Sequence, residues 1–495
     1  MKILLVYPQY PDTFWSFKHA LKFASKKASL PPLGLLTVAA MLPKEWEKKL
    51  VDMNAATLSD DNIKWADYVF ISAMAVQEKS VREIITRCKE LKVRTVAGGP
   101  LFTSTRENYP DVDYLVLNEA EITQPPFLED LAKGTLKRIY TSEERPDISK
   151  TVIPMWSLID MKKYFSMNIQ YSRGCHFNCE FCDIVALNGH TPRLKTSEQI
   201  VAELQAMYEQ GWRQGVFIVD DNFIGNKRKL KEEVLPAIID WMEKRKHPYT
   251  LYTEASINLA DDEELMTLMA KAGFDKVFVG IETPNEDSLV ECSKGQNTHR
   301  DLVASVKKIQ NFGLEVMGGF IVGFDSDPLT IFKNQINFIQ KSGIVTAMVG
   351  LLNAPPGTRL YDRLAKENRL LKGGFAGNNT DGSMNFVPKM DQEVLMKGHK
   401  EIVTTIYSYK NYYARIGAFL KEFKPRGPAV KINSQDIGSF FRSIWILGIK
   451  ERGRRQFWNL LLSTLFKNPR KIHVSMTLAI YGYHFRKITE VLVAG

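Results

Sequence analysis

The run Arg173-Gly174-Cys175-His176-Phe177-Asn178-Cys179-Glu180-Phe181-Cys182 holds three of the five cysteines of this 495-residue chain. Three residues separate the first two cysteines, and two residues separate the last two. Thiolates at this spacing can bond three irons of a cuboidal iron-sulfur cluster and leave the fourth iron without a protein ligand. An open iron is a site for a substrate or a cofactor.

A structural zinc site is the alternative interpretation of the same residues. Tetrahedral zinc usually takes four protein ligands, so His176 or His190 would have to supply the fourth. An odd, clustered set of cysteines favours metal chemistry over disulfides. Cys88 and Cys292 stand alone, and for them we expect packing roles.

The motif follows the strand-like run 169–171, which opens a series of alternating strand and helix patterns. The later strand candidates are residues 216–219, 250–254, 276–280, 316–322 and 347–352, with helical patterns such as 197–210 and 261–272 between them. Six strand-helix units predict a full or partial parallel barrel, whose chemistry gathers at the carboxyl ends of its strands.

A second alternating series precedes the motif. Its strand candidates are residues 2–7, 50–53, 68–72, 95–98 and 114–117, with amphipathic segments such as 81–91 between them. This order predicts a parallel sheet covered on both faces, with ligands at the carboxyl ends of the strands. The segments at those ends are Ser72-Ala73-Met74, Gly98-Gly99-Pro100 and Asn118-Glu119-Ala120-Glu121.

The predicted fold class is therefore α/β. We expect a doubly wound, flavodoxin-like domain at residues 1–142, a linker at 143–164, a partial (β/α) barrel at 165–390 and a mainly helical domain at 391–495. The glycine-rich run 373–379 predicts a loop that closes the barrel domain. No run of about 18 uncharged apolar residues is present, and the apolar start is too short for a signal peptide, so we expect a cytoplasmic protein.

The charge is concentrated in the last predicted domain. Residues 401–495 hold 16 Lys and Arg against 5 Asp and Glu, a net charge of +11, whereas the rest of the chain is at −1. The same 95 residues hold 15 aromatic side chains. They suit a large, flat or greasy molecule that carries a carboxylate, or an anionic membrane surface, but a helical bundle with an aromatic core fits equally well. Nucleic acid is not expected, because a long basic stripe is missing and the body is neutral.

The cysteine spacing, with the aromatic Phe181 before the third cysteine, resembles the radical S-adenosylmethionine superfamily. The resemblance implies a 4Fe-4S cluster on Cys175, Cys179 and Cys182, with S-adenosylmethionine chelating the open iron. It also implies S-adenosylmethionine-binding roles for residues at the ends of the later strands. These residues are Phe181, Asp220, Asp221, Glu254, Glu282, Gly318 and Gly319. Lys294 and Arg300 could hold a carboxylate, although solvated surface charges are the commoner role.

The first domain resembles the cobalamin-binding domains that precede many enzymes of this superfamily. The resemblance implies that the corrin and its nucleotide tail meet Ser72, Met74, Gly98, Gly99, Pro100, Glu119 and Glu121. A generic doubly wound domain is the alternative. Where related domains carry a cobalt-ligating histidine, this chain reads Asp52-Met53-Asn54-Ala55-Ala56-Thr57, and we expect a structural role for His19. A weakly ligated cobalt suits methyl transfer to a carbon radical.

The implied cycle uses two molecules of S-adenosylmethionine. One methylates cobalamin, and the other is cleaved at the reduced cluster to a radical that removes hydrogen from an unactivated carbon, which then takes the methyl group. An electron donor is therefore an expected partner. A cobalamin sensor with a structural cluster and a radical cyclase or rearrangement enzyme are the rival readings.

Over nearly its whole length the chain resembles a branch of cobalamin-dependent radical methylases that includes bacteriochlorophyllide side-chain methyltransferases and hopanoid 2-methyltransferases. The runs Phe14-Trp15-Ser16-Phe17-Lys18-His19 and Leu30-Pro31-Pro32-Leu33-Gly34-Leu35-Leu36 carry this finer resemblance. It implies methylation of a bacteriochlorophyllide side chain at C-8 or C-12, with a hopanoid or another lipid or natural product as the alternative substrate. The basic, aromatic last domain could also contact a membrane peripherally.

Overall fold

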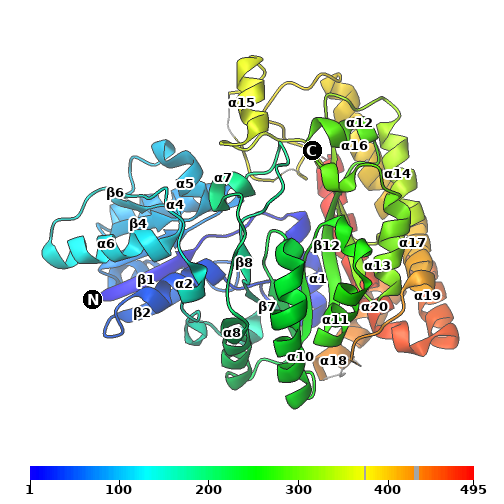
Figure 1. Cartoon of the computed structure of the whole chain (residues 1–495), viewed down its shortest axis with the longest axis horizontal. Helices are drawn as coiled ribbons and strands as arrows, with labels where there is room; N and C mark the ends of the chain where they lie inside the picture. Colours follow the sequence, from blue (N-terminus) through cyan, green and yellow to red (C-terminus); the bar gives the residue numbers. More distant parts are fainter. Residues whose placement is uncertain (373–374, 379, 429–433, 495) are drawn as a thin grey trace.

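The computed structural model describes residues 1–372, 375–378, 380–428 and 434–494. It shows the three parts expected from the sequence. The first domain, drawn in blue to cyan, lies beside a green core, and the last helices, in orange to red, cover the far side of that core (Figure 1). The predicted α/β class is confirmed.

The first domain is built on a parallel six-stranded sheet. Its strands lie in the order β2-β1-β3-β4-β5-β6, with β1 at Lys2–Tyr7, β2 at Glu47–Asp52, β3 at Tyr68–Ser72, β4 at Arg94–Gly98, β5 at Tyr114–Val116 and β6 at Ile139–Tyr140. Alternate residues of β1 face opposite sides. Leu4 and Val6 pack with α3 (Asp60–Trp65) and α4 (Glu78–Glu90), whereas Ile3 and Leu5 pack with α2 (Leu33–Met41) and α6 (Ala120–Lys133). Apolar burial on both faces explains the continuous apolar runs of these strands.

The core is a second parallel sheet whose six strands follow one another in sequence order. They are β7 (Ser166–Ile169), β10 (Gly215–Ile218), β11 (Thr250–Glu254), β12 (Phe274–Glu282), β13 (Glu315–Val322) and β14 (Ala347–Leu351). The covering helices are α8 (Ser197–Glu209), α10 (Leu235–Lys244), α11 (Glu263–Ala272), α13 (Leu302–Asn311) and α14 (Ile331–Ser342). β7 does not pair with β14, so the barrel is partial. The first strand ends at Ile169, whereas the sequence predicts that it begins there.

The open side of the partial barrel is covered by segments that are distant in sequence. They are the turn Phe14–Ser16 with α1 (Lys18–Ala24), and α20 (Ile472–Ala494), which contacts α1. The Phe14 and Phe485 rings stack with centroids 4.3 Å apart, and His484 bonds the Phe14 carbonyl oxygen at 2.9 Å. In Figure 1 the blue α1 lies within the green core beside the red α20. By its packing, the segment 14–24 therefore belongs to the barrel domain and not to the first domain.

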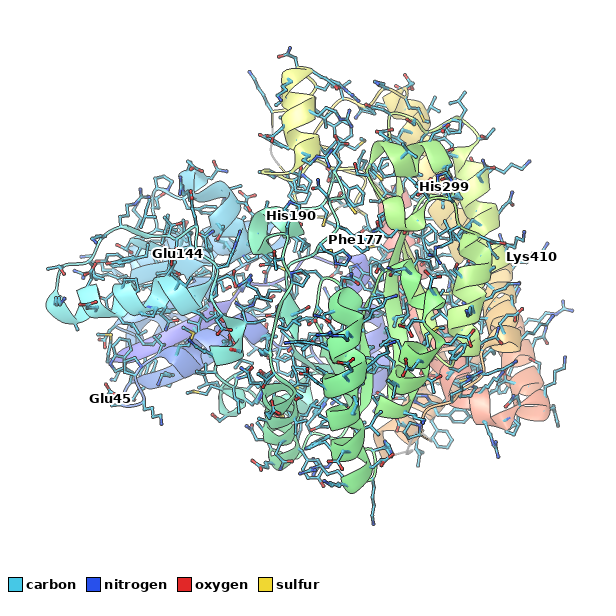
Figure 2. All side chains as sticks on the ribbon, in the orientation of Figure 1. Glu45, Glu144, Phe177, His190, His299 and Lys410 are labelled. Carbon is cyan, nitrogen blue, oxygen red and sulfur yellow. The ribbon has the colours of Figure 1, made fainter. Side chains whose placement is uncertain are left out.

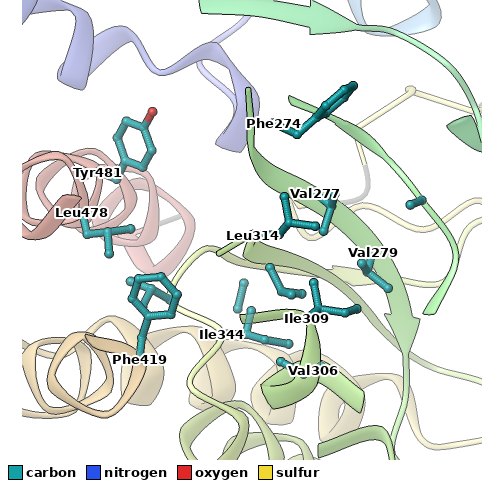
Figure 3. Packing of buried hydrophobic residues seen from close by; sticks show 14 of the residues in the cluster. Phe274, Val277, Val279, Val306, Ile309, Leu314, Ile344, Phe419, Leu478 and Tyr481 are labelled. Atoms are coloured by element: carbon teal, nitrogen blue, oxygen red, sulfur yellow. The ribbon is translucent and has the colours of Figure 1, made fainter. Parts of the chain in front are cut away.

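The last domain is helical, as predicted. Its helices are α16 (Gln392–Tyr407), α17 (Tyr409–Glu422), α18 (Ser434–Ser443) with a π-helical continuation at Ile444–Lys450, α19 (Arg454–Lys467) and α20. Figure 3 shows Phe419, Leu478 and Tyr481 of this domain close to Ile344 and Leu314 of the core. One apolar core therefore joins the last two domains. Among the described residues, none of the helices is both long and apolar enough to cross a membrane.

Candidate active site between the two sheets

The cysteine loop starts at the carboxyl end of β7, after the two-residue strand β8 (Ser172–Arg173) that pairs with β9 (Arg193–Leu194). Gly174 turns the chain with a φ of +95°, and a Cβ there would lie 2.8 Å from the Gly189 carbonyl oxygen. The Cys175 amide donates to that oxygen at 3.2 Å, and the Glu180 amide donates to the Cys292 carbonyl oxygen at 2.9 Å. The loop is therefore pinned at both ends.

An ion-pair network holds the middle of the loop. The Arg363 guanidinium donates to both Glu180 carboxylate oxygens, at 2.7 and 3.0 Å, and to Asp325 at 2.9 Å. Burial alone would raise the pKa of Asp325, but bonds from Arg369 and Arg363 lower it to about 2. Asp325 therefore remains ionised, and this network ties the loop to α15 (Arg359–Lys366).

The three thiols have the donor chemistry of a cluster site. Burial raises the pKa of Cys182 to about 12 and also raises the pKa of Cys175. These thiols would give up protons on binding iron. Among the described residues, no three His, Cys, Asp or Glu side chains are grouped to hold one metal ion. A cuboidal cluster needs no such grouping, because each thiolate bonds a different iron. His190 lies on the side of Phe177 that faces the first domain (Figure 2).

Two polar side chains lie beside the thiols: Lys294, which the sequence marks as a possible partner of a carboxylate, and Gln296, which the sequence does not mark. The Gln296 amide is 3.9 Å from the Cys179 sulfur. Lys294 is buried and pairs with Glu282 at 2.6 Å. Burial alone would lower the pKa of Lys294, but Glu282 and the thiols of Cys179 and Cys182 raise it, so Lys294 stays charged. Lys294 follows Glu282 by twelve residues, and no spacing rule connects them.

Three carboxyl groups gather at the carboxyl ends of β10 and β11. Asp220 accepts from the Tyr171 amide at 2.8 Å and the Ser172 hydroxyl at 2.6 Å, and burial raises its pKa to about 7. Asp221 accepts from the Gly174 amide at 3.4 Å. Burial, together with the charges of Asp221 and Asp220, raises the pKa of Glu254 to about 8. This local excess of negative potential suits a cationic ligand group.

The remaining residues predicted to bind S-adenosylmethionine occupy different faces. Phe181 lies near Phe324, with ring centroids 6.2 Å apart. Glu282 ends β12 with a φ of +63°. A Cβ on Gly319 would lie 2.8 Å from the inward-facing Phe278 ring, whereas one on Gly318 would lie 2.8 Å from Phe320 and 3.1 Å from Ile344. Gly319 therefore faces the inside of the barrel, and Gly318 faces its helices.

Arg173 connects the cysteine loop to the first domain. Its guanidinium donates to Glu119 at 2.7 Å and to both oxygens of Glu121 at 2.8 and 3.0 Å. Arg193 also donates to both oxygens of Glu119, at 2.9 and 2.8 Å. These carboxylates, predicted to line cobalamin, thus face arginines of the core. The carboxyl end of the first sheet is thereby fixed against the cysteine loop.

The other residues predicted to meet cobalamin lie at the ends of β3 and β4. Gly99 has a φ of +90°, and a Cβ there would lie 2.6 Å from the Ser72 hydroxyl, while one on Gly98 would run into the Val116 carbonyl oxygen. Pro100 starts α5 (Pro100–Thr105), and Met74 is 40% exposed. Close packing against Ser72 and Val116 thus requires glycine at both positions, at the edge of the sheet where ligands of this fold bind.

Further features of the first domain bear on cobalamin. The buried Gln124 Oε1 has no hydrogen-bond partner within the described chain, so an acceptor is available on α6. The Asp52 carboxylate accepts from the Tyr164 hydroxyl at 3.0 Å. His19 lies beside His484 of α20, with ring centroids 5.6 Å apart, which is a packing role in the core.

The inner face of the barrel is aromatic. Phe217 of β10 and Tyr252 of β11 stack with centroids 4.8 Å apart, and Phe278 follows on β12. Trp15 joins them from the turn before α1. Its ring meets Phe278 edge-on at 5.3 Å, its Nε1 is 2.9 Å from the Met348 sulfur, and it is 38% exposed. The open side of the barrel thus carries a partly exposed apolar wall.

Comparisons with known families agree with this division of the chain. Residues 23–127 match a B12 binding domain, residues 169–334 match the radical SAM superfamily, and residues 358–495 match a domain of unknown function. The chain also resembles a solved cobalamin-dependent S-adenosylmethionine radical enzyme, OxsB, over 100% of this chain and 80% of that one. The TM-score is 0.62 at 14% identity, which speaks for the fold alone.

Curated relatives cover most of the chain. An uncharacterized methyltransferase of Synechocystis is 41% identical over 99% of this chain and 92% of its own length. The hopanoid C-2 methylase of Rhodopseudomonas palustris is 35% identical over 94% of this chain and 90% of its own length. The bacteriochlorophyllide d C-12(1)-methyltransferase of Chlorobaculum tepidum is 23% identical over 67% of this chain and 73% of its own.

Proposed function

Because this chain belongs to the cobalamin-binding radical S-adenosylmethionine methyltransferases, we propose that it methylates an unactivated carbon of a flat, polycyclic, largely apolar molecule. The observation that carries this proposal is the arrangement around the cysteine loop. The loop lies between the carboxyl ends of the two sheets and is tied to the first by Arg173. Three reactive centres could therefore meet there.

Cys175, Cys179 and Cys182 would bind three irons of a 4Fe-4S cluster. When reduced, this cluster supplies the electron that breaks a carbon-sulfur bond of S-adenosylmethionine. Gln296 lies close enough to Cys179 to donate a weak hydrogen bond to its sulfur. Lys294 adds a positive charge beside the thiolates, which would stabilise the negative charge of a reduced cluster.

Asp220, Asp221 and Glu254 would take part in binding S-adenosylmethionine. Unlike Asp220 and Asp221, Glu254 forms no hydrogen bond with another described side chain. Its raised pKa shows that little positive charge offsets its carboxylate. A methionyl ammonium beside it would supply the compensating charge. Asp220 and Asp221 brace the start of the cysteine loop through Tyr171, Ser172 and Gly174. Phe181, Glu282, Gly318 and Gly319 complete the proposed set.

Cobalamin would bind at the ends of β3 and β4, against Ser72, Met74, Gly98, Gly99 and Pro100. There it supplies a methyl group bound to cobalt. The carboxylates of Glu119 and Glu121 are already bound by Arg173 and Arg193. These two residues would therefore serve the cobalamin site by holding the end of the first sheet against the cysteine loop. The nearby Asp52 offers no imidazole and is itself bonded to Tyr164.

A hopanoid ring carbon is the substrate that we favour. Trp15, Phe278 and Met348 present aromatic and thioether groups to the inside of the barrel, which suits a molecule without charge. The similarity to the hopanoid C-2 methylase of Rhodopseudomonas palustris, which extends through 90% of that protein, supports the same substrate class.

A bacteriochlorophyllide side chain is the second candidate. The similarity to the Chlorobaculum tepidum methyltransferase favours it, but its carboxylate would need a free cation near the barrel. Among the described residues of the barrel strands and their loops, Lys294 is paired with Glu282 and Lys276 with Asp275 at 2.6 Å. The basic residues between 450 and 470 belong to α19 and its flanks, on the outside of the barrel. A substrate carboxylate at either of these two lysines would therefore have to displace Glu282 or Asp275.

Anaerobic turnover tests the reaction and the substrate together. The purified chain, reconstituted with iron, sulfide and cobalamin, is supplied with S-adenosylmethionine, a chemical reductant and either a hopanoid without a 2-methyl group or bacteriochlorophyllide d. We expect 5'-deoxyadenosine and S-adenosylhomocysteine in equal amounts, and a methylated hopanoid. 5'-Deoxyadenosine without S-adenosylhomocysteine would indicate a rearrangement enzyme, and methylation of the bacteriochlorophyllide alone would reverse the substrate choice.

A further inference from the structure

An apolar stripe is exposed along α18 and its π-helical continuation. Ile437, Phe441, Trp445 and Ile449 follow at intervals of four residues and are 52, 65, 54 and 49% exposed. Residues four apart lie on one side of a helix. Burial of large apolar side chains such as Phe441 and Trp445 is strongly favourable. A stripe of four that stays in water is unusual for a folded surface.

A second exposed stripe lies on α19, which packs on the first. Trp458, Leu462, Leu465 and Phe466 are 36, 46, 46 and 82% exposed. The Trp458 indole donates to the Gly448 carbonyl oxygen at 2.9 Å, which joins α19 to the π-helical segment. Together, residues 437–466 form what we call the α18–α19 surface. Tyr407 and Tyr412 of the same domain, by contrast, are almost completely buried.

The α18–α19 surface is bordered by basic residues. Seven Lys and Arg lie between residues 440 and 470, against the single acid Glu451: Arg442, Lys450, Arg452, Arg454, Arg455, Lys467 and Arg470. No ion pair joins any of the seven to a carboxylate of the described residues. Glu451 is bonded to the Tyr409 hydroxyl. The Lys450 ammonium lies 5.0 Å from the centre of the Trp445 ring.

We propose that the α18–α19 surface binds the face of an anionic lipid bilayer. Phe441, Trp445 and Phe466 would enter the interface between head groups and acyl chains, where aromatic rings are favoured, and the basic rim would contact anionic head groups. A second copy of the chain would bring the same seven cations against each other, because a two-fold interface is formed by identical patches. The charge therefore favours an acidic lipid surface.

The place of this surface in the fold leaves the candidate active site accessible. His473 at the start of α20 interacts electrostatically with Lys276 near the start of β12 and with Asp436 of α18. α18 therefore lies at the amino end of the core strands, whereas the cysteine loop lies at their carboxyl ends. Figure 1 shows α18 at the lower edge and α7 (Ile184–Asn188), which follows the cysteines, in the upper half. The bound protein would direct its reactive end away from the bilayer. This inference does not depend on the proposed substrate.

Vesicle sedimentation of the full-length, cluster-reconstituted protein tests the proposal. We expect binding to vesicles of phosphatidylcholine that contain about 30% phosphatidylglycerol, and little binding to vesicles of phosphatidylcholine alone. The double variant R454Q/R455Q should bind the anionic vesicles about 25-fold more weakly, since each basic residue near such a surface contributes about fivefold. Raising the salt concentration should weaken the wild type similarly.

The apolar half of the proposal has its own variant and its own control. F441S/W445S should lower vesicle affinity about tenfold or more. L329S removes a smaller apolar side chain that is 71% exposed on a loop of the core, and it should bind as the wild type does. Far-ultraviolet circular dichroism and cluster absorbance establish that each variant is folded.

Three outcomes would overturn the proposal. The wild type could fail to bind anionic vesicles, F441S/W445S could bind as well as L329S, or neutral and anionic vesicles could bind alike. Light scattering distinguishes the competing explanation: a wild-type dimer that F441S/W445S converts to a monomer would assign this surface to contact between copies.

Discussion

Replacement of Arg173 by Met tests whether one side chain holds the first domain against the cysteine loop. The Arg173, Glu119 and Glu121 side chains are only 15, 8 and 14% exposed. Removing one partner of a buried ion pair costs about 3 to 5 kcal/mol, because the other charge stays buried without compensation. Glu119 keeps Arg193, but Glu121 keeps only the Thr151 hydroxyl, at 2.9 Å. We therefore expect a loss of about 3 kcal/mol, or about 150-fold in the folding equilibrium.

A double-mutant cycle separates the ion pair from the loss of packing. E121Q in the R173M background removes the uncompensated charge and should recover about 1 to 2 kcal/mol. Urea unfolding of the four proteins, followed by tryptophan fluorescence, gives the coupling energy. R82M is the matched control, because Arg82 pairs with Glu78 on α4 and is 52% exposed, so its loss should cost less than about 1 kcal/mol. Additive effects of R173M and E121Q, within about 0.5 kcal/mol, would refute the reasoning.

The pH dependence provides a second check on Arg173. Burial raises the pKa of Glu121, but the bonds from Arg173 more than offset this, so the pKa lies below its ordinary value. A lowered folded-state pKa stabilises the protein above the unfolded-state pKa, and this contribution is lost as the pH falls. The difference in stability between the wild type and R173M should therefore shrink as the pH is lowered below about 4.5.

Three further predictions concern the site. C179A should lose the cluster absorbance and turnover. The control variant C88A, at a buried position on α4, should keep the absorbance. Retained absorbance in C179A would contradict the cluster assignment. In urea unfolding, E254Q should be as stable as the wild type at pH 4.5 and more stable at pH 8.5. The reason is that the wild type loses stability as the pH rises through the raised pKa of Glu254, about 8. Equal stability of the two proteins at both pH values would contradict this prediction. G98A should lower the free energy of unfolding in urea by about 2 kcal/mol or more and weaken cobalamin binding, whereas G34A, with open space around its Cβ, should not. Equal free energies of unfolding for the wild type and G98A would count against the close approach to Val116.

Both parallel sheets could be predicted because apolar runs alternate with helical patterns along most of the chain. Two strands are exceptions: the sequence predicts the first core strand three residues too late, and it does not predict β6. In β7 the inward positions Ser166 and Asn168 are polar and yet buried, so the strand lacks an apolar signature. The Asn168 amide donates to the Pro31 carbonyl oxygen at 3.1 Å, a contact from a distant segment that local pattern cannot reveal.

The candidate site could be predicted in part. The cysteines follow from their spacing, whereas the resemblance to the superfamily implies the acidic residues at strand ends. The engagement of Glu119 and Glu121 by Arg173 could not be predicted, because it depends on how the two sheets face each other. The sequence marks Trp15 only through the family resemblance, because its contact with Phe278 depends on how the chain returns to the barrel.

The sequence allows the aromatic residues of the last domain to form either a core or a binding surface, and the structure divides them between the two. Tyr407 and Tyr412 are core, and their hydroxyls donate to the Ala347 and Leu478 carbonyl oxygens at 2.6 and 2.7 Å. Phe441 and Trp445 are exposed. Composition counts both kinds alike, and only the packing separates them.

The contact between Phe14 and α20 also bears on biosynthesis. His484 and its acceptor on Phe14 are 470 positions apart, so a ribosome that adds about 5 to 20 residues per second needs about 25 to 95 s to supply the second partner after the first. During that interval the nascent barrel exposes its aromatic wall, including Trp15, to solvent. Protection by a chaperone, and delivery of iron and sulfide only after α20 has docked, would then be part of making an active molecule.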